Sequence, residues 1–459
     1  MDLVIMNGTL VDAHRTIQAD IGIENGLIKA VGKLDALQAK DRIDAKGKYV
    51  FPGIIDVHNH IDHVGGAEKT RDDFFQGTRA AACGGVTTLM DFAMQKRDET
   101  VPSAIRRRRE QADGKVCIDY GLHGNITHLD DESLASIPKI IKQGYSSFKL
   151  FMTFRKAGFI VEDPILYEVM KTVYDNNGMV GIHAENDTIC EYLTDKYVNA
   201  GKTSTRYHAE SRPNIAEAEC ISRAILFAEH TDSALYVFHL TTHEGVQLVR
   251  DAKRRGLRIY AETCPHYLTL TEEMYNRNDA QNFIMTPPLR KAEDIEALWE
   301  GISDNTILIV SSDHCCFDST QKKIRDDQSF RDITPGIPGN ETLLPIVYQF
   351  GVNSGRITIN KMIELLSYNP ARLFGMQPQK GSLNPGADAD LVIFDPEKQV
   401  VLGPDVLHMV TDYSPYDGIT LSGYPVKTIS KGKVIVSEGV FSGKEGEGRF
   451  LKRNKPEFF

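Results

Sequence analysis

The length, composition and charge of the chain exclude several classes of protein. Its 459 residues, of which 41% are hydrophobic and 25% charged, suit a globular protein with one large and one smaller domain, or with two to four domains. The net charge of −10 argues against nucleic acid or an anionic membrane as the main partner. No apolar stretch approaches the ~18 residues that span a bilayer, and the first segment, "MDLVIMNGTLVD", lacks the basic and apolar regions of a signal peptide. We therefore expect a cytoplasmic protein.

The two ends of the chain share one pattern. Residues 1–52 contain short strand-like pieces separated by NG and KG turns, and residues 380–459 repeat this style in "ADLVIFDP" and "VKTISKGKVIVSEG". Neither end is long enough to form a convincing sheet alone. We predict that both ends together form one small composite β-sandwich domain.

Eight apolar, β-branched runs alternate with helical patterns through the middle of the chain. They occupy residues 54–60, 86–92, 118–126, 146–152, 179–186, 235–242, 258–264 and 307–314. Several are almost continuously apolar, which is typical of parallel strands buried on both faces. Two of the helical patterns stop at Gly144 and Gly256, as expected of glycines that follow a helix. The pattern predicts an α/β fold, a (β/α)8 TIM barrel over residues 53–379, since such a barrel commonly needs ~250 residues.

Side chains that can bind a metal end several of these strands. The set comprises His58, His60, His183, His239 and Asp313 at the strand ends, with Lys149 inside the fourth strand. In barrels of this kind the active site lies at the C-terminal ends of the strands. One histidine in an apolar strand is usually a core residue, but a series at matching strand ends indicates a common site.

His58 and His60 can ligate one ion together. Residues i and i+2 of a strand point to the same side, and neutral imidazole nitrogens are metal ligands. His183 and His239 offer a second pair, with Asp313 in addition. His63 lies just beyond, and we expect it either to support the site or to lie on the surface.

Lys149 would be a buried cation in the run "SSFKLFM", which is costly. Two outcomes would relieve the cost. The ammonium could reach a carboxylate or solvent. Alternatively, burial could depress its pKa, and the neutral amine could react with carbon dioxide to give a carbamate. The two oxygens of that anion could bridge two divalent ions.

These residues resemble a known family. "DVHNH", the lysine of the fourth strand, "HAEN", "FHLTT" and "SSDH" are similar to the amidohydrolase superfamily, most closely to its dihydropyrimidinase/hydantoinase branch, on the D-hydantoinase side. "YVFPGIIDVH", "GTRAAACGGVTT", "YHAESRP", "AETCPHYL", "NPARLFG", "GADADLVIFDP", "DYSPYDG" and "GRFLKR" agree with it. The resemblance covers essentially the whole chain, in order.

The resemblance implies two divalent ions per subunit, expected to be zinc, and a carboxylated Lys149. His58, His60, Lys149 and Asp313 would hold the first ion, and Lys149, His183 and His239 the second. A metal-bridging hydroxide would open a cyclic ureide or imide of the hydantoin or dihydropyrimidine type, with Asp313 moving the proton. It also implies a cytoplasmic homotetramer or homodimer.

Three positions depart from the hydantoinase pattern, all where substrate should bind. Phe154 replaces a tyrosine whose hydroxyl helps to hold the developing oxyanion, and an oxyanion donor can be worth ~3–4 kcal/mol. Thr286 replaces a serine before the Pro-Pro pair. Pro335 stands where the family often has asparagine, and proline has no N–H. Family drift and altered specificity both remain open. Cys315 and Cys316 could line the same pocket or be packing residues.

Other functions make distinct predictions. An allantoinase or L-hydantoinase-like enzyme would use the same chemistry on a different ring; "NETLLP" loosely favours it, whereas "CGGVTT" and "YHAESRP" favour the D-hydantoinase side. A non-catalytic scaffold like the dihydropyrimidinase-related neuronal proteins would have lost metal ligands, but every ligand position here is filled. The sequence has no GxGxxG after a predicted strand and no P-loop, so no motif supports an oxidoreductase or a phosphate-binding barrel.

Overall fold

The computed structural model describes residues 1–34, 38–65, 68–323 and 328–459. Eight parallel strands form a sheet in the order β15-β14-β13-β12-β11-β10-β9-β6. A parallel bridge between Asn59 and His314 joins the end of β6 to the segment after β15, and so brings the two edges together. The predicted (β/α)8 barrel is confirmed. Its strands are β6 (Ile54–Asn59), β9 (Val86–Met94), β10 (Asp119–Ile126), β11 (Ser147–Phe151), β12 (Met179–His183), β13 (Leu235–Val237), β14 (Ile259–Thr263) and β15 (Ile309–Val310).

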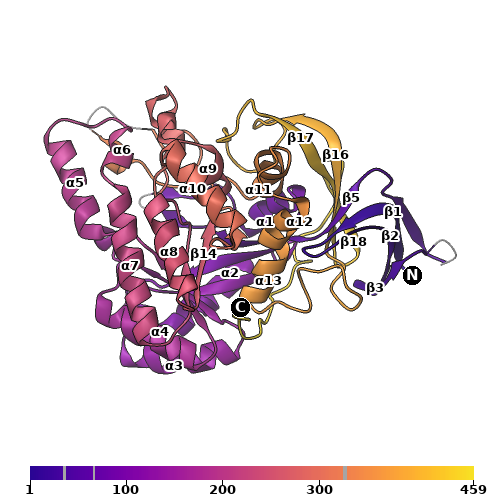
Figure 1. The fold of residues 1–459 in the computed structure, drawn as a ribbon, viewed down its shortest axis with the longest axis horizontal. Helices are drawn as coiled ribbons and strands as arrows, with labels where there is room; N and C mark the ends of the chain where they lie inside the picture. The colour runs from indigo at the N-terminus through magenta and orange to yellow at the C-terminus, as the bar shows by residue number, and fades with distance from the viewer. Residues whose placement is uncertain (35–37, 66–67, 324–327) are drawn as a thin grey trace.

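Helices cover the outside of the barrel (Figure 1). The longer ones are α1 (Phe74–Cys83), α2 (Val101–Ala112), α3 (Asp131–Lys142), α4 (Asp163–Asp175), α5 (Asp187–Asn199), α7 (Asn214–His230), α8 (His243–Arg254) and α10 (Ala292–Ser303). The Asp130 and Thr242 side chains accept backbone N–H groups at the starts of α3 and α8. Gly144 and Gly256 follow these helices with φ of 101° and 82°, which confirms the predicted helix ends.

Short elements complete the barrel. They are α6 (Tyr207–Glu210), α9 (Pro265–Thr269), α11 (Leu343–Val347), α12 (Ile359–Ile363), α13 (Asn369–Leu373), the 3-10 turns Arg155–Ala157, Glu272–Asn276, Ala280–Phe283 and Phe330–Asp332, the π-helical turns Tyr348–Val352 and Glu364–Tyr368, and the strand pair β7 (Val64–Gly65) and β8 (Glu68–Lys69). Most of them lie in connections that follow barrel strands, the segments from which such barrels build their sites.

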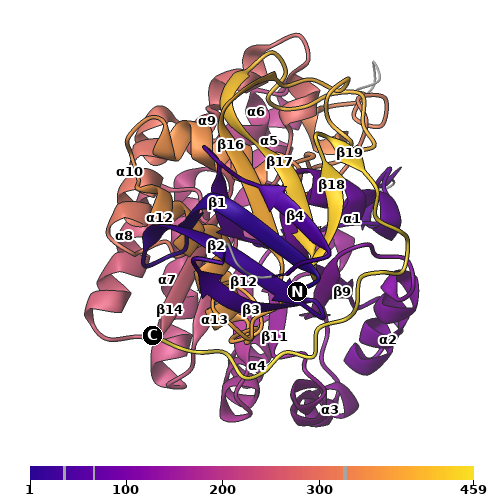
Figure 2. The same ribbon diagram turned by 90° about the vertical axis from the view of Figure 1, so that its right-hand side faces the viewer.

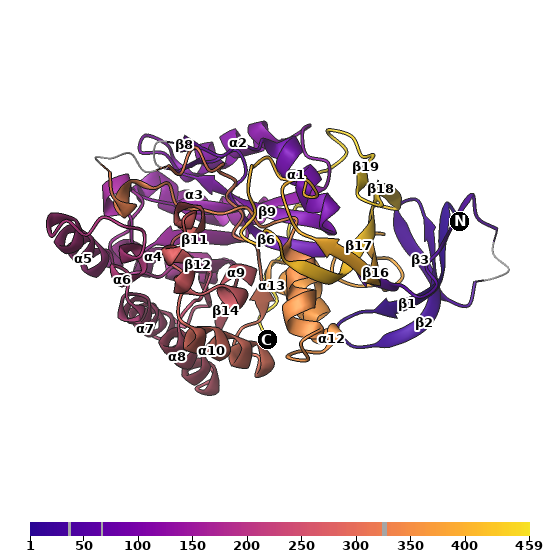
Figure 3. The same ribbon diagram turned by 90° about the horizontal axis from the view of Figure 1, so that it is seen from above.

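Strands from both chain ends form one nine-stranded sheet. It contains β1 (Leu3–Val11), β2 (Thr16–Glu24), β3 (Leu27–Gly32), β4 (Asp41–Asp44), β5 (Tyr49–Pro52), β16 (Leu391–Val401), β17 (Thr420–Ser430), β18 (Lys433–Ser437) and β19 (Val440–Phe441). Antiparallel pairing of β16 with β5 joins the two ends. Figure 3 shows this domain at one end of the molecule, beside the barrel. The composite β domain is confirmed, and boundaries at residues 52/53 and 379/380 stay a prediction.

The last residues return to the barrel at the N-terminal ends of its strands. Leu451 N–H donates to the Tyr120 carbonyl at 2.8 Å, and Phe459 N–H donates to the Tyr260 hydroxyl at 3.0 Å. Figure 2 shows this segment, in yellow, crossing the lower half of the view to the C-terminus. The opposite, C-terminal ends of the strands are thereby left for the site. Among the described residues, no helix is long and apolar enough to cross a membrane.

Candidate active site

A cavity of about 410 Å³ lies at the C-terminal ends of the barrel strands. Five of the six residues predicted to bind metal line it: His60, Lys149, His183, His239 and Asp313. The sixth, His58, is fully buried and in contact with Asp313. The structure therefore brings together all six side chains, which the sequence separates by up to 255 positions (58 to 313).

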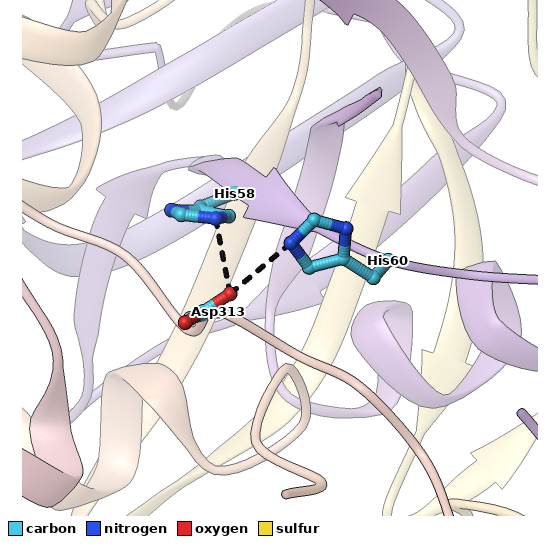
Figure 4. A group of neighbouring side chains, drawn as sticks. All are labelled: His58, His60 and Asp313. Carbon is cyan, nitrogen blue, oxygen red and sulfur yellow. Dashed lines mark ion pairs between the residues drawn. The ribbon is translucent and has the colours of Figure 1, made fainter. Parts of the chain in front are cut away.

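His58, His60 and Asp313 form the tightest group (Figure 4). The Asp313 Oδ1 atom lies 3.0 Å from His58 Nε2 and 3.3 Å from His60 Nε2. Both imidazoles point to one side because they are two residues apart at the end of β6. Burial by itself would raise the pKa of Asp313, but His58 and His60 outweigh it and hold this pKa well below its usual value.

Asp313 and His239 reach the site from beyond regular strands. The predicted runs 307–314 and 235–242 contain only Ile309–Val310 and Leu235–Val237 as strand. His239 and Asp313 then adopt left-handed backbone conformations, with φ of 36° and 47°. Such conformations cost about 1–3 kcal/mol each and occur at functional sites. Here they turn the chain out of the strand direction where these two side chains enter the cavity.

Lys149 lies in the middle of β11 and is buried. Its Nζ atom is 3.0 Å from His58 Nε2, and it lies 4.5 Å and 4.6 Å from the centres of the Phe92 and Phe238 rings. No ion pair joins it to a carboxylate within the described ranges, although it lines the cavity. Burial lowers its pKa to about 8, although Asp313 opposes the change. A buried amine of this kind exists partly in its neutral, nucleophilic form near neutral pH.

His183 and His239 form the second imidazole pair, with ring centres 4.5 Å apart. Burial lowers the pKa of His60, His183 and His239. Their imidazoles are therefore neutral at pH 7, which is the form that binds metals. The pKa of His58 is raised instead, because the carboxylates of Asp313 and Glu262 outweigh the effect of its burial. Clustered neutral imidazoles beside a carboxylate are a donor set that fits a divalent transition metal.

Two buried glutamates orient these histidines, and the sequence analysis did not single them out. Glu262 Oε1 lies 2.5 Å from His58 Nδ1, and its other oxygen accepts the Tyr236 hydroxyl at 2.8 Å. Glu185 Oε2 lies 2.6 Å from His183 Nε2. Each contact occupies one ring nitrogen and leaves the other for the site. The sequence feature that could have identified the two glutamates is a carboxylate at the end of or within an apolar run, in "HAEN" and in "RIYAETC".

A partly buried arginine keeps Glu185 ionised. Arg212 donates to Glu185 Oε2 at 3.0 Å. Burial alone would raise the pKa of Glu185, but Arg212 outweighs it, and the pKa falls to about 2. The guanidinium carbon of Arg212 also lies 5.7 Å from the centre of the Phe154 ring. The glutamate is thus a fixed negative charge behind His183.

All three positions that depart from the hydantoinase pattern line the cavity: Phe154, Thr286 and Pro335. Phe154 has φ of 65°, and its ring centre is 5.1 Å from that of His183. His63 lines the cavity as well. Cys315 is also in its wall, whereas Cys316 packs away from it, with its thiol 3.4 Å from the Val410 carbonyl oxygen. The departures are therefore placed where they can affect substrate.

Comparisons with known proteins agree with this geometry. Residues 49–435 match the model of the amidohydrolase family, and residues 1–48 match that of the urease alpha-subunit N-terminal domain. A D-hydantoinase of Ralstonia pickettii is 42% identical over 458 residues, covering 99% of each chain. A D-phenylhydantoinase of Escherichia coli (strain K12) is 40% identical over 461 residues, covering 99% of this chain and 98% of the other.

The likeness extends to three dimensions. The crystal structure of a dihydropyrimidinase from Brevibacillus agri superimposes with a TM-score of 0.97 at 36% identity, covering 99% of both chains. Fold, site geometry and sequence thus lead to the same assignment. The chain belongs to the amidohydrolase family and is a hydrolase of its dihydropyrimidinase/hydantoinase branch.

Proposed function

We propose that this hydrolase opens the ring of a cyclic ureide or imide of the hydantoin or dihydropyrimidine type, with two divalent metal ions in the cavity. One observation carries the proposal: four imidazoles, one carboxylate and a buried lysine that forms no ion pair with the described residues come together in and directly beneath one cavity. Zinc is the metal we propose, because a mixed set of imidazole and carboxylate ligands suits it.

The ligands follow from the way the side chains group. We assign His58, His60, Lys149 and Asp313 to the first ion, and Lys149, His183 and His239 to the second. Lys149 would serve both as a carbamate, N6-carboxylysine. Its burial, its pKa of about 8 and its lack of a carboxylate partner among the described residues support this assignment. When bound, such a metal pair supplies a hydroxide nucleophile near neutral pH and polarises the scissile carbonyl.

Asp313 is the proposed proton carrier. Its carboxylate projects into the cavity beside His58 and His60 and is ionised at neutral pH. It can accept the proton of the attacking water and deliver it to the ring nitrogen as the C–N bond breaks. The product would be a ring-opened carbamoyl or ureido acid.

The apolar side of the cavity is the proposed substrate contact. Phe154, Thr286 and Pro335 would lie against the ring. Phe154 keeps the aromatic surface of the usual tyrosine without its hydroxyl, so the enzyme lacks one donor to the developing oxyanion. This favours, as a second candidate, an allantoinase or L-hydantoinase-like activity on a different ring. The filled set of donor residues disfavours a non-catalytic scaffold.

Two measurements test the proposal. Elemental analysis of the purified protein should find about two zinc ions per chain, since the two donor groups hold one each. Hydantoin, dihydrouracil and allantoin should then be assayed side by side for the ring-opened acid. Absence of turnover by metal-loaded enzyme on all three would refute the proposed substrate class. Sedimentation analysis tests the predicted homotetramer or homodimer, and cell fractionation tests the cytoplasmic location.

A further inference from the structure

Two backbone segments meet in one wall of the cavity, beside Cys315. Met285 and Thr286 belong to the first, and residues 335–337 form the second. Gly336 N–H donates to the Ile284 carbonyl at 3.0 Å, and Cys315 N–H donates to the Ile337 carbonyl at 2.9 Å. The wall therefore consists of three backbone segments that lie side by side and are joined by hydrogen bonds.

The second segment lies unusually close to its neighbour. Gly336 has φ of 135°, a conformation that side chains other than glycine rarely adopt. A Cβ atom at this position would lie 2.8 Å from the Cys315 Cβ atom. The preceding residue, Pro335, has no N–H with which to anchor itself. The position of this segment consequently depends on the Gly336 N–H and on the partners of its carbonyl groups.

Lys322 supplies such a partner from behind the wall. Its side chain is fully buried, and its ammonium donates to three carbonyl oxygens: Asn282 at 3.4 Å, Ile284 at 2.9 Å and Gly336 at 2.5 Å. Three acceptors match the three protons of an ammonium. The Ile284 carbonyl accepts from both Lys322 and Gly336, so both segments share one hydrogen-bonded junction.

Lys322 is a buried cation. It makes no ion pair in the part of the chain that the structure describes, and burying an unpaired cation is costly. Burial lowers its pKa to about 7, and the Cys315 thiol opposes this. That thiol is itself neutral, because burial raises its pKa well above its usual value. Among the described residues, the groups facing the ammonium are therefore three carbonyl dipoles and one neutral thiol. Hydrogen bonds from an ionised donor are roughly twice as strong as neutral ones.

We propose that Lys322 is a positioning residue: its ammonium clamps segments 282–286 and 335–337 together and so sets the wall against which the substrate ring binds. Lys322 does not itself line the cavity, and it acts through Met285, Thr286 and Gly336, which do. The contacts of Lys322 are sufficient to support the clamp. The effect of the clamp on substrate binding rests, in addition, on the proposed function.

Hydrogen exchange measured by mass spectrometry tests the clamp without any substrate. We expect Lys322→Met to speed exchange in peptides covering 282–287 and 333–338 by about tenfold or more, because three charge-assisted bonds are lost. Lys323, the next residue, is exposed. Lys323→Met is thus the matched control, and it should leave exchange unchanged. Unchanged exchange in folded Lys322→Met would overturn the proposal.

Steady-state kinetics test the effect on substrate. With hydantoin or dihydrouracil as the probe, Lys322→Met should raise KM by about tenfold and leave kcat within about threefold, since only the wall and no reacting group is altered. In the unaltered enzyme KM should rise as the pH passes upward through about 7, where the ammonium loses its proton. The variant should not show this rise.

The outcomes separate the two proposals. If the unaltered enzyme turns over no cyclic ureide, the proposed function fails. The hydrogen-exchange measurement is then the remaining test of the clamp. If exchange rises but KM does not, the clamp is structural and its role in positioning is refuted. If Lys322→Met does not fold, Lys322→Gln takes its place. The amide of glutamine retains two donors, so hydrogen exchange in the same peptides should be faster than in the unaltered enzyme and slower than in the unfolded chain. An exchange rate equal to that of the unaltered enzyme would count against the clamp.

Discussion

Replacing Glu262 by glutamine should weaken metal binding without disturbing the barrel. Glutamine has nearly the same shape, so the change removes the negative charge that holds His58 Nδ1 at 2.5 Å. Both side chains are fully buried, and a hydrogen bond to a charged group contributes about 1.5–3 kcal/mol. That range corresponds to a loss of metal affinity of about 10- to 100-fold, which is the usual effect of changing a residue that orients a metal ligand.

The assay is a competition between apoprotein and a chelator of known zinc affinity, read by absorbance. Tyr236→Phe is the matched control, because it removes the hydroxyl that contacts Glu262 at 2.8 Å and leaves the contact between Glu262 and His58 in place. We expect Tyr236→Phe to change metal affinity by no more than about threefold. Zinc affinity in Glu262→Gln that equals that of the unaltered protein would refute the orienting role.

Three further predictions concern the chemistry. Asp313→Asn should keep the fold and lower kcat by about 10²- to 10⁴-fold, because it removes the proton carrier; an intact kcat with verified metal content would reject that role. Phe154→Tyr should raise kcat/KM for dihydrouracil, by up to about 10²-fold, because it restores an oxyanion donor; no change would favour family drift over altered specificity. Lys149→Ala, like prolonged chelation of the unaltered enzyme, should abolish turnover and lower Tm, since bound ions stabilise the folded state. Full activity and full zinc content in Lys149→Ala would contradict the bridging role of this residue. NMR of the enzyme with labelled bicarbonate can test the carbamate of Lys149 directly.

Local patterns were sufficient for much of the site. The spacing of His58 and His60 follows from the two-residue alternation of a strand, and the apolar run around Lys149 indicates a buried amine. Both observations need only a few neighbouring residues. The matching ends of parallel strands then placed His183, His239 and Asp313 at the same end of the barrel, because that geometry holds throughout such barrels.

Other features required the folded chain. The extents of the strands before His239 and Asp313 were overestimated. The strands end at Val237 and Val310, and His239 and Asp313 then adopt left-handed conformations that their local sequence does not indicate. Glu262 looked like any polar residue in an apolar run until the barrel placed it against His58, 204 positions away.

Lys322 illustrates the limit most clearly. Its flanking sequence, "STQKKIRDD", reads as a polar loop, and Lys323 next to it is indeed exposed. Only the tertiary structure turns Lys322 inward, onto carbonyl groups 38 and 14 positions away in the chain. The sequence by itself determined the fold class and indicated which side chains gather at the ends of the barrel strands, because alternation and strand order are local or general properties. The partners of buried charges were decided by closure of the barrel, which brings distant backbone together and excludes water from the groups between.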